Sequence, residues 1–353
     1  MKNKILFFLL NGVGGAERMT ITISKFFNKD LFDVHYVVVC EGDDKILNFL
    51  PKRASVSFIR VKNPYCNLTY KLYKKIKKER PNSVFCASPA INTRLIIAAK
   101  VYGKTRVVVR SSNMYSFERK DVQLLMRLTY PWADKIILQQ DEMRDELHKN
   151  INVPRDKTIT LQNPLDSWSI EEGIKAPSPY NEDNNIKFLS VGRVSHEKGQ
   201  DILIKAFSIV HRNIPTTSLY IVGKYDEKSS FFRYLSDLIQ SQGVSDSVHM
   251  VGMDFNPYKW MKHCDCFVLP SRCEGLPNVL LEAMSLGKPS VSTLCLPIIK
   301  RLIEEGQNGY YCPIEDDVKL ATAMMNAIKL KDCKLNYKPA SPEDFINQLI
   351  ITR

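Results

Sequence analysis

Short apolar runs alternate with amphipathic segments along the chain, a pattern typical of α/β proteins. Residues 5–10 form a continuous apolar run, which is the signature of a strand buried on both faces. A glycine-rich stretch, residues 11–15, follows this run, and from residue 16 onward apolar and polar residues alternate at helical spacing. Strand, glycine loop and helix in this order predict the start of a doubly wound α/β domain.

The same alternation continues through two long segments of the chain. In the first segment we expect strands at 34–42, 82–88, 105–113 and 134–140, and helices at 68–80, 91–103 and 141–150. A second series starts at residue 186, and its later strands are expected at 218–224, 247–253, 264–271 and 288–293. The sequence therefore predicts two Rossmann-like domains.

Domain boundaries follow from a break in composition. Residues 166–185 are polar, contain two prolines and show no periodicity, so we expect a linker there. The predicted organisation is an N-terminal Rossmann-like domain at 1–165, a C-terminal one at 186–330, and a tail at 331–353. The tail is expected to contain a helix that crosses back to the N-terminal domain. In parallel sheets of this kind, ligands bind at the carboxyl ends of the strands.

Charge is distributed unevenly over these two domains. The formal net charge of the chain is +12, and residues 1–165 hold 29 Lys and Arg against 15 Asp and Glu. Residues 51–100 alone contain 12 basic residues and one acid, Glu79. This asymmetry favours an anionic partner such as nucleic acid, a membrane surface or a phosphate-bearing substrate, although simple solubility would also account for it.

The chain contains nine cysteines, an odd number without regular spacing, which indicates a reducing compartment rather than a disulfide-bonded protein.

The stretch SRCEGLPNVLLEAM, which starts at residue 271, contains two glutamates, Glu274 and Glu282, eight positions apart. Pro277 is expected to start a helix, whose first-turn amides at Asn278, Val279 and Leu280 could bind a pyrophosphate. Glu282 lies further along this helix, where its carboxylate could accept hydrogen bonds from ribose hydroxyls. Glu274 would then face the reacting group. Alternatively, Glu282 pairs with a basic side chain and Glu274 is merely exposed.

Other polar residues follow other predicted strands. Arg193 and Lys198 come after the strand that starts at residue 186, and two cations at a strand end suit a diphosphate leaving group. Gly14 and Gly15 allow the close approach of a backbone to a ligand. Asn113 follows a valine-rich strand. The sequence contains no Asp-x-Asp pair, no metal-ligand spacing, no P-loop and no nucleic-acid-binding motif.

Taken together, four segments resemble glycosyltransferase family 4, in which enzymes are retaining and adopt the GT-B architecture. The segments are GGAER, GRVSHEKG, LPSRCEGLPNVLLEAMSLGKPSV and GQNGYYCP, in this order. The resemblance implies that Glu274 contacts the donor sugar, that Arg193 and Lys198 contact the diphosphate, and that Asn113 faces the sugar. It also implies a nucleotide-sugar site that includes Gly14, Gly15, Gly192, Gly252, Gly275, Leu276, Pro277, Asn278, Val279 and Glu282.

Two departures from the family pattern concern the donor. Arg301 stands where many members have a glutamate, and residues 223–227 read GKYDE where a Gly-x-Gly is common. Neither departure alters the residues expected at the diphosphate.

The resemblance implies a metal-independent hexosyltransferase without a cofactor. It would move a hexose or N-acetylhexosamine from a nucleotide sugar, with UDP as the expected nucleotide, to a lipid-linked oligosaccharide in cell-surface polysaccharide synthesis, such as lipopolysaccharide O-antigen or capsule. The N-terminal domain would then bind the acceptor. We expect a cytoplasmic protein, peripheral on the inner face of the cytoplasmic membrane. The lysines of the 68–80 helix could rest on anionic lipid; alternatively, this helix covers the sheet and its lysines form an ordinary solvated face. The alternatives are a nucleotide-sugar epimerase of the same fold and a non-enzymatic protein that binds anionic ligands.

Overall fold

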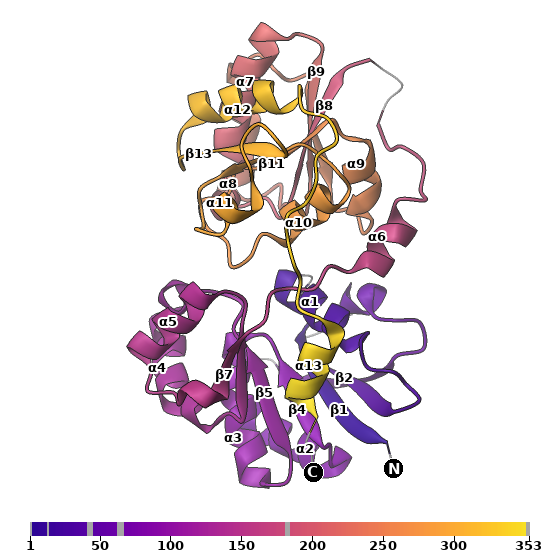
Figure 1. The fold of residues 1–353 in the computed structure, drawn as a ribbon, viewed down its shortest axis with the longest axis vertical. Helices are drawn as coiled ribbons and strands as arrows, with labels where there is room; N and C mark the ends of the chain where they lie inside the picture. Colours follow the sequence, from indigo (N-terminus) through magenta and orange to yellow (C-terminus); the bar gives the residue numbers. More distant parts are fainter. Residues whose placement is uncertain (1, 13, 41–44, 62–66, 181–183, 351–353) are drawn as a thin grey trace. The chain divides into compact units, whose positions relative to one another are not determined.

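The computed structural model describes residues 2–12, 14–40, 45–61, 67–180 and 184–350. The chain forms two compact units (Figure 1). Unit 1 contains residues 1–164 and 338–353, and unit 2 contains residues 165–337. Each unit is built around its own parallel β-sheet, which confirms the predicted fold class of two Rossmann-like domains.

Unit 1 has a seven-stranded sheet in the order β3-β2-β1-β4-β5-β6-β7, and every pairing between neighbours is parallel. The strands are β1 (Asn3–Leu10), β2 (Phe32–Cys40), β3 (Ser55–Arg60), β4 (Ser83–Cys86), β5 (Arg106–Arg110), β6 (Lys135–Leu138) and β7 (Thr158–Thr160). The apolar run at the start of the chain forms β1, where Leu6 and Phe7 have no exposed surface. The order reverses between β1 and β4, so the loops after these strands meet at a topological switch point.

Helices cover both faces of this sheet. Four of them pack on one face through a shared core that includes Leu72, Leu95, Met126 and Leu147. These helices are α2 (Leu68–Glu79), α3 (Pro89–Tyr102), α4 (Lys120–Thr129) and α5 (Asp141–Asn150). The opposite face is covered by α1 (Gly15–Ser24) and α13 (Pro342–Leu349). Short 3-10 helices occur at η1 (Lys45–Phe49), η2 (Tyr115–Phe117), η3 (Tyr130–Trp132) and η4 (Arg155–Lys157).

Helix α13 belongs to unit 1 although it comes from the C-terminal end of the described chain (Figure 1). Its apolar side chains Phe345 and Leu349 are fully buried in the core on this face of the sheet, and the helix contacts β4 and β5. The carbonyl of Gln348 accepts a hydrogen bond from Arg106 Nε over 2.8 Å, and the carbonyl of Leu349 accepts one from the Ser83 hydroxyl. The tail is therefore anchored by side-chain burial and by polar contacts to two strands.

Unit 2 has a six-stranded parallel sheet in the order β10-β9-β8-β11-β12-β13. The strands are β8 (Ile186–Val191), β9 (Thr217–Val222), β10 (Val248–Gly252), β11 (Cys266–Leu269), β12 (Ser290–Thr293) and β13 (Gly309–Cys312). The helices are α6 (Ser167–Gly173), α7 (Gln200–Asn213), α8 (Ser230–Ser241), α9 (Pro257–His263), α10 (Asn278–Ser285), α11 (Ile299–Leu302) and α12 (Asp317–Ala327), with the 3-10 helix η5 (His196–Lys198). Here the strand order reverses between β8 and β11, so the loops that follow these two strands meet.

The segment expected to be a linker, residues 166–185, is structured over much of its described length. Asp166 caps helix α6 by accepting hydrogen bonds from the Ser169 amide (3.2 Å) and hydroxyl (2.9 Å). Ile170 and Tyr180 are buried in the core of unit 2, and the Tyr180 hydroxyl donates to the Trp260 carbonyl over 2.9 Å. The polar composition hid these contacts because two buried side chains suffice to attach the segment.

Candidate active site

The loop after β8 contains both predicted cations and is fixed by glycine geometry. Gly199 has a φ of +65°, and a side chain there would place Cβ 2.0 Å from the Pro270 carbonyl oxygen. Only glycine therefore allows this loop to pack against the end of β11. The Gln200 side chain holds the loop from inside the unit, donating to the Arg193 carbonyl (3.1 Å) and accepting from the Ser195 amide (3.3 Å).

Lys198 and Glu274 form an ion pair at the point where the two loops meet. Lys198 Nζ lies 2.6 Å from Glu274 Oε1, although the two residues are 76 positions apart in the sequence. The Ser271 hydroxyl donates to the same carboxylate oxygen over 2.7 Å. Glu274 retains 10% of its side-chain exposure and Lys198 27%, so the pair is partly shielded from water. An ammonium group has three donors, so Lys198 can hold Glu274 and a phosphate oxygen at once.

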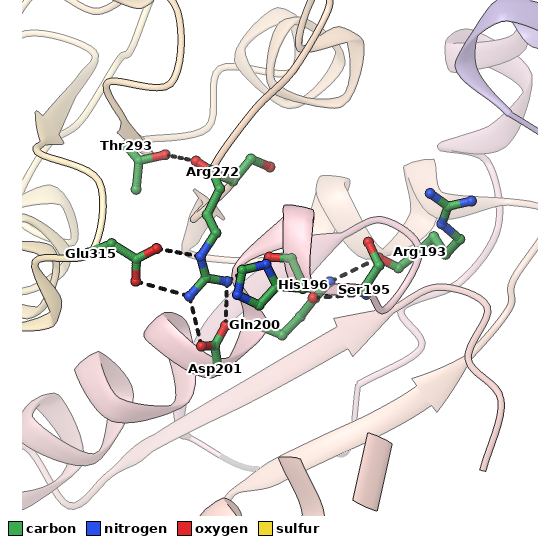
Figure 2. A network of polar contacts seen from close by, with 9 residues as sticks. Arg193, Ser195, His196, Gln200, Asp201, Arg272, Thr293 and Glu315 are labelled. Carbon is green, nitrogen blue, oxygen red and sulfur yellow. Dashed lines mark hydrogen bonds and ion pairs between the residues drawn. The ribbon is translucent and has the colours of Figure 1, made fainter. Parts of the chain in front are cut away.

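Arg193, the other predicted cation, lies on the same loop but is exposed. In Figure 2 its guanidinium points away from the side chains of Arg272 and Asp201. Its neighbour Glu197 has a lowered pKa, first because of a hydrogen bond from Ser195 and also because of the Arg193 charge.

Arg272 joins the two loops through a network that the sequence did not reveal (Figure 2). Its guanidinium binds the Asp201 carboxylate through two hydrogen bonds of 2.8 Å and also pairs with Glu315. It donates to the His196 carbonyl over 2.6 Å, while its own amide donates to the Glu197 carbonyl over 2.8 Å. Arg272 therefore fastens the turn that precedes Lys198 to the loop that contains Glu274.

Glu282 lies in helix α10, eight residues beyond Glu274, and only 8% of its surface is exposed. The Tyr258 hydroxyl, from helix α9, donates to Glu282 Oε1 over 3.5 Å. The helix begins at Asn278, with Pro277 as the residue before it. The two glutamates therefore occupy different settings, one in a loop beside a lysine and one inside a helix.

The first-turn amides of this helix, expected at a pyrophosphate, are partly engaged by carbonyls that precede the helix. The Asn278 amide donates to the Leu276 carbonyl (2.9 Å) and the Leu280 amide to the Pro277 carbonyl (3.0 Å). The chain turns tightly at Pro277, which brings these carbonyls within reach. The remaining predicted residues of this segment, Gly275 and Val279, are partly exposed, whereas Leu276 and Pro277 are buried.

Glycines at the ends of β8, β9 and β10 bring their backbones close together. The Gly192 amide donates to the Val222 carbonyl over 2.9 Å, and the Gly223 amide to the Gly252 carbonyl over 2.8 Å. A side chain at Gly223 would place Cβ 1.8 Å from the Gly192 carbonyl oxygen. Gly192 and Gly252, both predicted at the nucleotide-sugar site, are thus hydrogen-bonded to the end of strand β9.

Arg301, the residue that departs from the family pattern, is exposed on helix α11.

Three predicted site residues belong to unit 1. Gly14 precedes helix α1 and Gly15 is its first residue, and both are exposed. Asn113 is exposed, and its amide donates to Glu118 Oε1 over 3.0 Å. That these residues act in one site with those of unit 2 stays a prediction.

The charge of Glu274 affects the pKa of two cysteines, Cys273 and Cys295. Burial, together with the negative charge of Glu274, raises the pKa of Cys295 to about 12 and also raises the pKa of Cys273. Both groups are therefore neutral thiols near pH 7, which argues against a cysteine nucleophile. Among the described residues, no three His, Cys, Asp or Glu side chains come together in a way that could hold a metal ion.

Sequence reasoning missed the Arg272, Asp201 and Glu315 network. Arg272 lies within the quoted motif, two residues before Glu274, which is the only signal that could have drawn attention to it. Asp201 is 71 residues away and Glu315 is 43 residues away, so no local pattern links them.

Comparison with known families accounts for almost the whole chain. Residues 13–168 match the family model described as Glycosyltransferase Family 4, and residues 172–344 match the model described as Glycosyl transferases group 1. The chain is a glycosyltransferase of the family 4 type. This confirms the predicted family and its hexosyltransferase-type activity.

Relatives of this glycosyltransferase match different fractions of its chain. An uncharacterized glycosyltransferase of Methanocaldococcus jannaschii is 30% identical over 64% of this chain and 59% of its own length. A Campylobacter jejuni enzyme is 27% identical over 94% of this chain and 90% of its own. Its name is N-acetylgalactosamine-N,N'-diacetylbacillosaminyl-diphospho-undecaprenol 4-alpha-N-acetylgalactosaminyltransferase. The solved structure of Anabaena HepE with UDP and glucose has a TM-score of 0.77, 20% identity and coverage of 93% and 90%. This likeness confirms the GT-B fold.

Proposed function

We propose that this glycosyltransferase is retaining and metal-independent, and that it transfers a hexose or N-acetylhexosamine from a UDP-sugar to a lipid-linked sugar acceptor. The observation that supports this proposal best is the pairing of Lys198 with Glu274 at the switch point of the unit 2 sheet, with Glu282 on the helix that follows. Ligands of open α/β sheets bind at such points.

The three side chains divide the work on the donor. Lys198 stabilises the negative charge that grows on the diphosphate as its bond to the sugar breaks. Glu274, held by Lys198 and Ser271, contacts the sugar. Glu282 accepts hydrogen bonds from the ribose hydroxyls, for which its shielded carboxylate is suited. The resemblance to the family supports each of these roles.

The reaction follows front-face substitution. The acceptor oxygen forms a bond to the anomeric carbon on the side from which the diphosphate departs. The bond between that carbon and the β-phosphate oxygen breaks, and its electron pair leaves on UDP. The proton of the acceptor hydroxyl passes to the same departing oxygen, so no protein base is required.

The nature of the acceptor is inferred from relatives and from charge. The Campylobacter jejuni relative is named for a diphospho-undecaprenol acceptor, which is a lipid carrier. Unit 1, with a net charge of +14 from 31 Lys and Arg against 17 Asp and Glu, suits an anionic membrane surface. No described helix is long and apolar enough to cross a bilayer. We therefore place the enzyme at the inner face of the cytoplasmic membrane, in cell-surface polysaccharide synthesis.

The test starts with the donor. A panel of UDP-, GDP-, ADP- and dTDP-sugars is added to the purified protein, and the melting temperature is recorded, because a ligand that binds the native state raises it. The best donor is then incubated with undecaprenyl-diphosphate-linked sugars, and the anomeric configuration of the product is read by NMR.

We expect stabilisation by UDP-sugars and a product with the donor's anomeric configuration. An inverted product would contradict the retaining mechanism, and stabilisation only by nucleotides other than uridine nucleotides would contradict UDP. A donor sugar altered in the absence of any acceptor would instead support an epimerase.

A further inference from the structure

Helix α4 exposes a row of large apolar side chains to solvent. Leu124 and Leu128 are each 59% exposed, and Trp132, in η3 directly after the helix, is 55% exposed. Leu124 and Leu128 are four residues apart, so they lie on one side of α4, and Trp132 follows four residues later in η3. We call them the α4 ridge. Contiguous exposed apolar side chains on a soluble protein indicate an interaction surface.

The fold does not need the α4 ridge. The inner side of the helix is filled by other apolar residues, because Val122 and Met126 are buried at 6% and 0% exposure in the core of unit 1. Helix α4 is therefore apolar on two sides, of which only one is used for packing.

The surroundings of the ridge are basic. Arg119, Lys120 and Arg127 are exposed on or next to helix α4. Two nearby acids are already paired with cations: Asp121 with Arg119 at 3.1 Å and Asp134 with Lys100 at 2.6 Å. Because these two pairs balance, Lys120 and Arg127 give the surface around the ridge its excess of positive charge.

Helix α2 adds lysines to the same layer. Helices α2, α3 and α4 cover one face of the sheet, and α3 contacts both of the others. The apolar residues of α2, Leu68, Leu72 and Ile76, are buried, so this helix has no apolar stripe left for lipid. Its outer positions Lys71, Lys74, Lys77 and Lys78 are exposed.

We propose that the α4 ridge inserts into the interface of an anionic phospholipid bilayer, while the lysines of α2 contact the headgroups. Apolar side chains flanked by Lys and Arg, with a tryptophan at one end, suit the boundary between headgroups and acyl chains. Charge argues against a second copy of the chain as the occupant, since two such surfaces would bring like charges together. The inference rests on the proposed function only in that a lipid-linked acceptor requires a membrane.

Tryptophan fluorescence tests insertion directly, because the chain contains three tryptophans. Trp168→Phe retains Trp132 and Trp260, and Trp260 is only 7% exposed. Trp132→Phe is the matched control, because it retains the 68% exposed Trp168 on unit 2. Each variant is mixed with vesicles of phosphatidylglycerol and phosphatidylcholine that contain lipids brominated in the acyl chains.

The expected result is a loss of about half of the emission in Trp168→Phe, a blue shift of the remainder, and no change in Trp132→Phe. Vesicle flotation of Leu124→Gln/Leu128→Gln provides the second readout. This double variant should bind the vesicles at least tenfold more weakly than wild type, with unchanged melting temperature and unchanged stabilisation by a UDP-sugar.

Three outcomes would overturn the proposal. One is vesicle binding without quenching of Trp132, which would mean that the lysines act alone. Another is unchanged flotation of the double variant. The last is a wild-type dimer that becomes monomeric in the double variant without any change in vesicle binding, which would assign the ridge to a contact between copies. Because the donor assay is independent, failure of the ridge and failure of the proposed function are distinguishable.

Discussion

Replacement of Arg272 by methionine should destabilise unit 2. The substitution removes two hydrogen bonds of 2.8 Å to Asp201, the pairing with Glu315 and the bond to the His196 carbonyl. The Arg272 and Asp201 side chains are 14% and 10% exposed, so the variant leaves a carboxylate largely shielded from water without its cation. Removing one partner of a buried pair costs about 3–5 kcal/mol.

Solvent around the network lowers this figure. Glu315 is 58% exposed and contributes little, so the expected loss is about 2–3 kcal/mol in the free energy of unfolding. For a unit of this size, the loss corresponds to a fall of roughly 4–12 °C in melting temperature. Urea denaturation in a Trp132→Phe background measures it, since Trp168 and Trp260 then report on unit 2 alone.

The loss should depend on pH in a defined direction. Burial would raise the pKa of Asp201, but the hydrogen bonds and charge of Arg272 lower it below its ordinary value of 3.8. A lowered pKa stabilises the fold above the unfolded pKa, and this stabilisation disappears as the pH falls through the folded pKa. In Arg272→Met the hydrogen bonds and charge of Arg272 are lost, and burial, which raises the pKa of Asp201, is opposed only by backbone hydrogen bonds at Asp201 and Ile202. The difference between wild type and variant should therefore be large at pH 7 and shrink below pH 4.

Lys319→Met is the matched control within unit 2, because Lys319 is 66% exposed and pairs with Asp316 over 3.4 Å. It should change the free energy of unfolding by less than about 0.5 kcal/mol. An equally small change in Arg272→Met, or a loss that is independent of pH, would refute the reasoning.

Three further outcomes are expected. Turnover should persist in excess EDTA, because in the proposed mechanism Lys198 takes the place of a metal ion at the diphosphate; activity lost with EDTA and restored by Mn²⁺ or Mg²⁺ would contradict this. Lys198→Ala should lower kcat/KM by about 10²–10³, measured by steady-state kinetics, because it removes charge stabilisation from the leaving group and the partner of Glu274; a change below threefold would count against its role. Hydrogen bonds from Lys4 and Lys75 lower the pKa of Glu79 from 4.5 to about 2. Unit 1 should therefore lose stability as the pH falls from about 4.5 towards 2, and Glu79→Gln should flatten that loss in acid denaturation.

The sequence predicted those strands and helices whose pattern of apolar residues matches the way they are buried in the fold. Continuous apolar runs became the buried central strands, such as β1 and β4, because a strand covered on both faces needs apolar residues at every position. Strand β3 was not predicted, since it lies at the sheet edge and residues 55–60 are only partly apolar. Helix α4 was not predicted either, because its exposed leucines stand among its buried ones and blur the helical period.

In the candidate site, the residues that directly follow a strand could be predicted from the sequence. Lys198 and Glu274 each follow a predicted strand, and the order of the sheet brings those two strands together. The contacts of Arg272 were not predictable, because its partners lie far away in the sequence. The hydrogen bond of the Asn278 amide was not predictable either, because it depends on the tight turn at Pro277.

The central claim is that Glu282 and Glu274 act on different parts of the donor. It is tested most directly by titration calorimetry of UDP with Glu282→Ala and Glu274→Ala, with folding checked by circular dichroism. A hydrogen bond to a charged group contributes about 1.5–3 kcal/mol, so Glu282→Ala should weaken UDP binding roughly 10- to 100-fold. Glu274→Ala should bind UDP nearly as wild type does and lose kcat instead. Loss of UDP binding in Glu274→Ala with retention in Glu282→Ala would reverse the roles, and unchanged UDP binding and turnover in both variants would contradict the account.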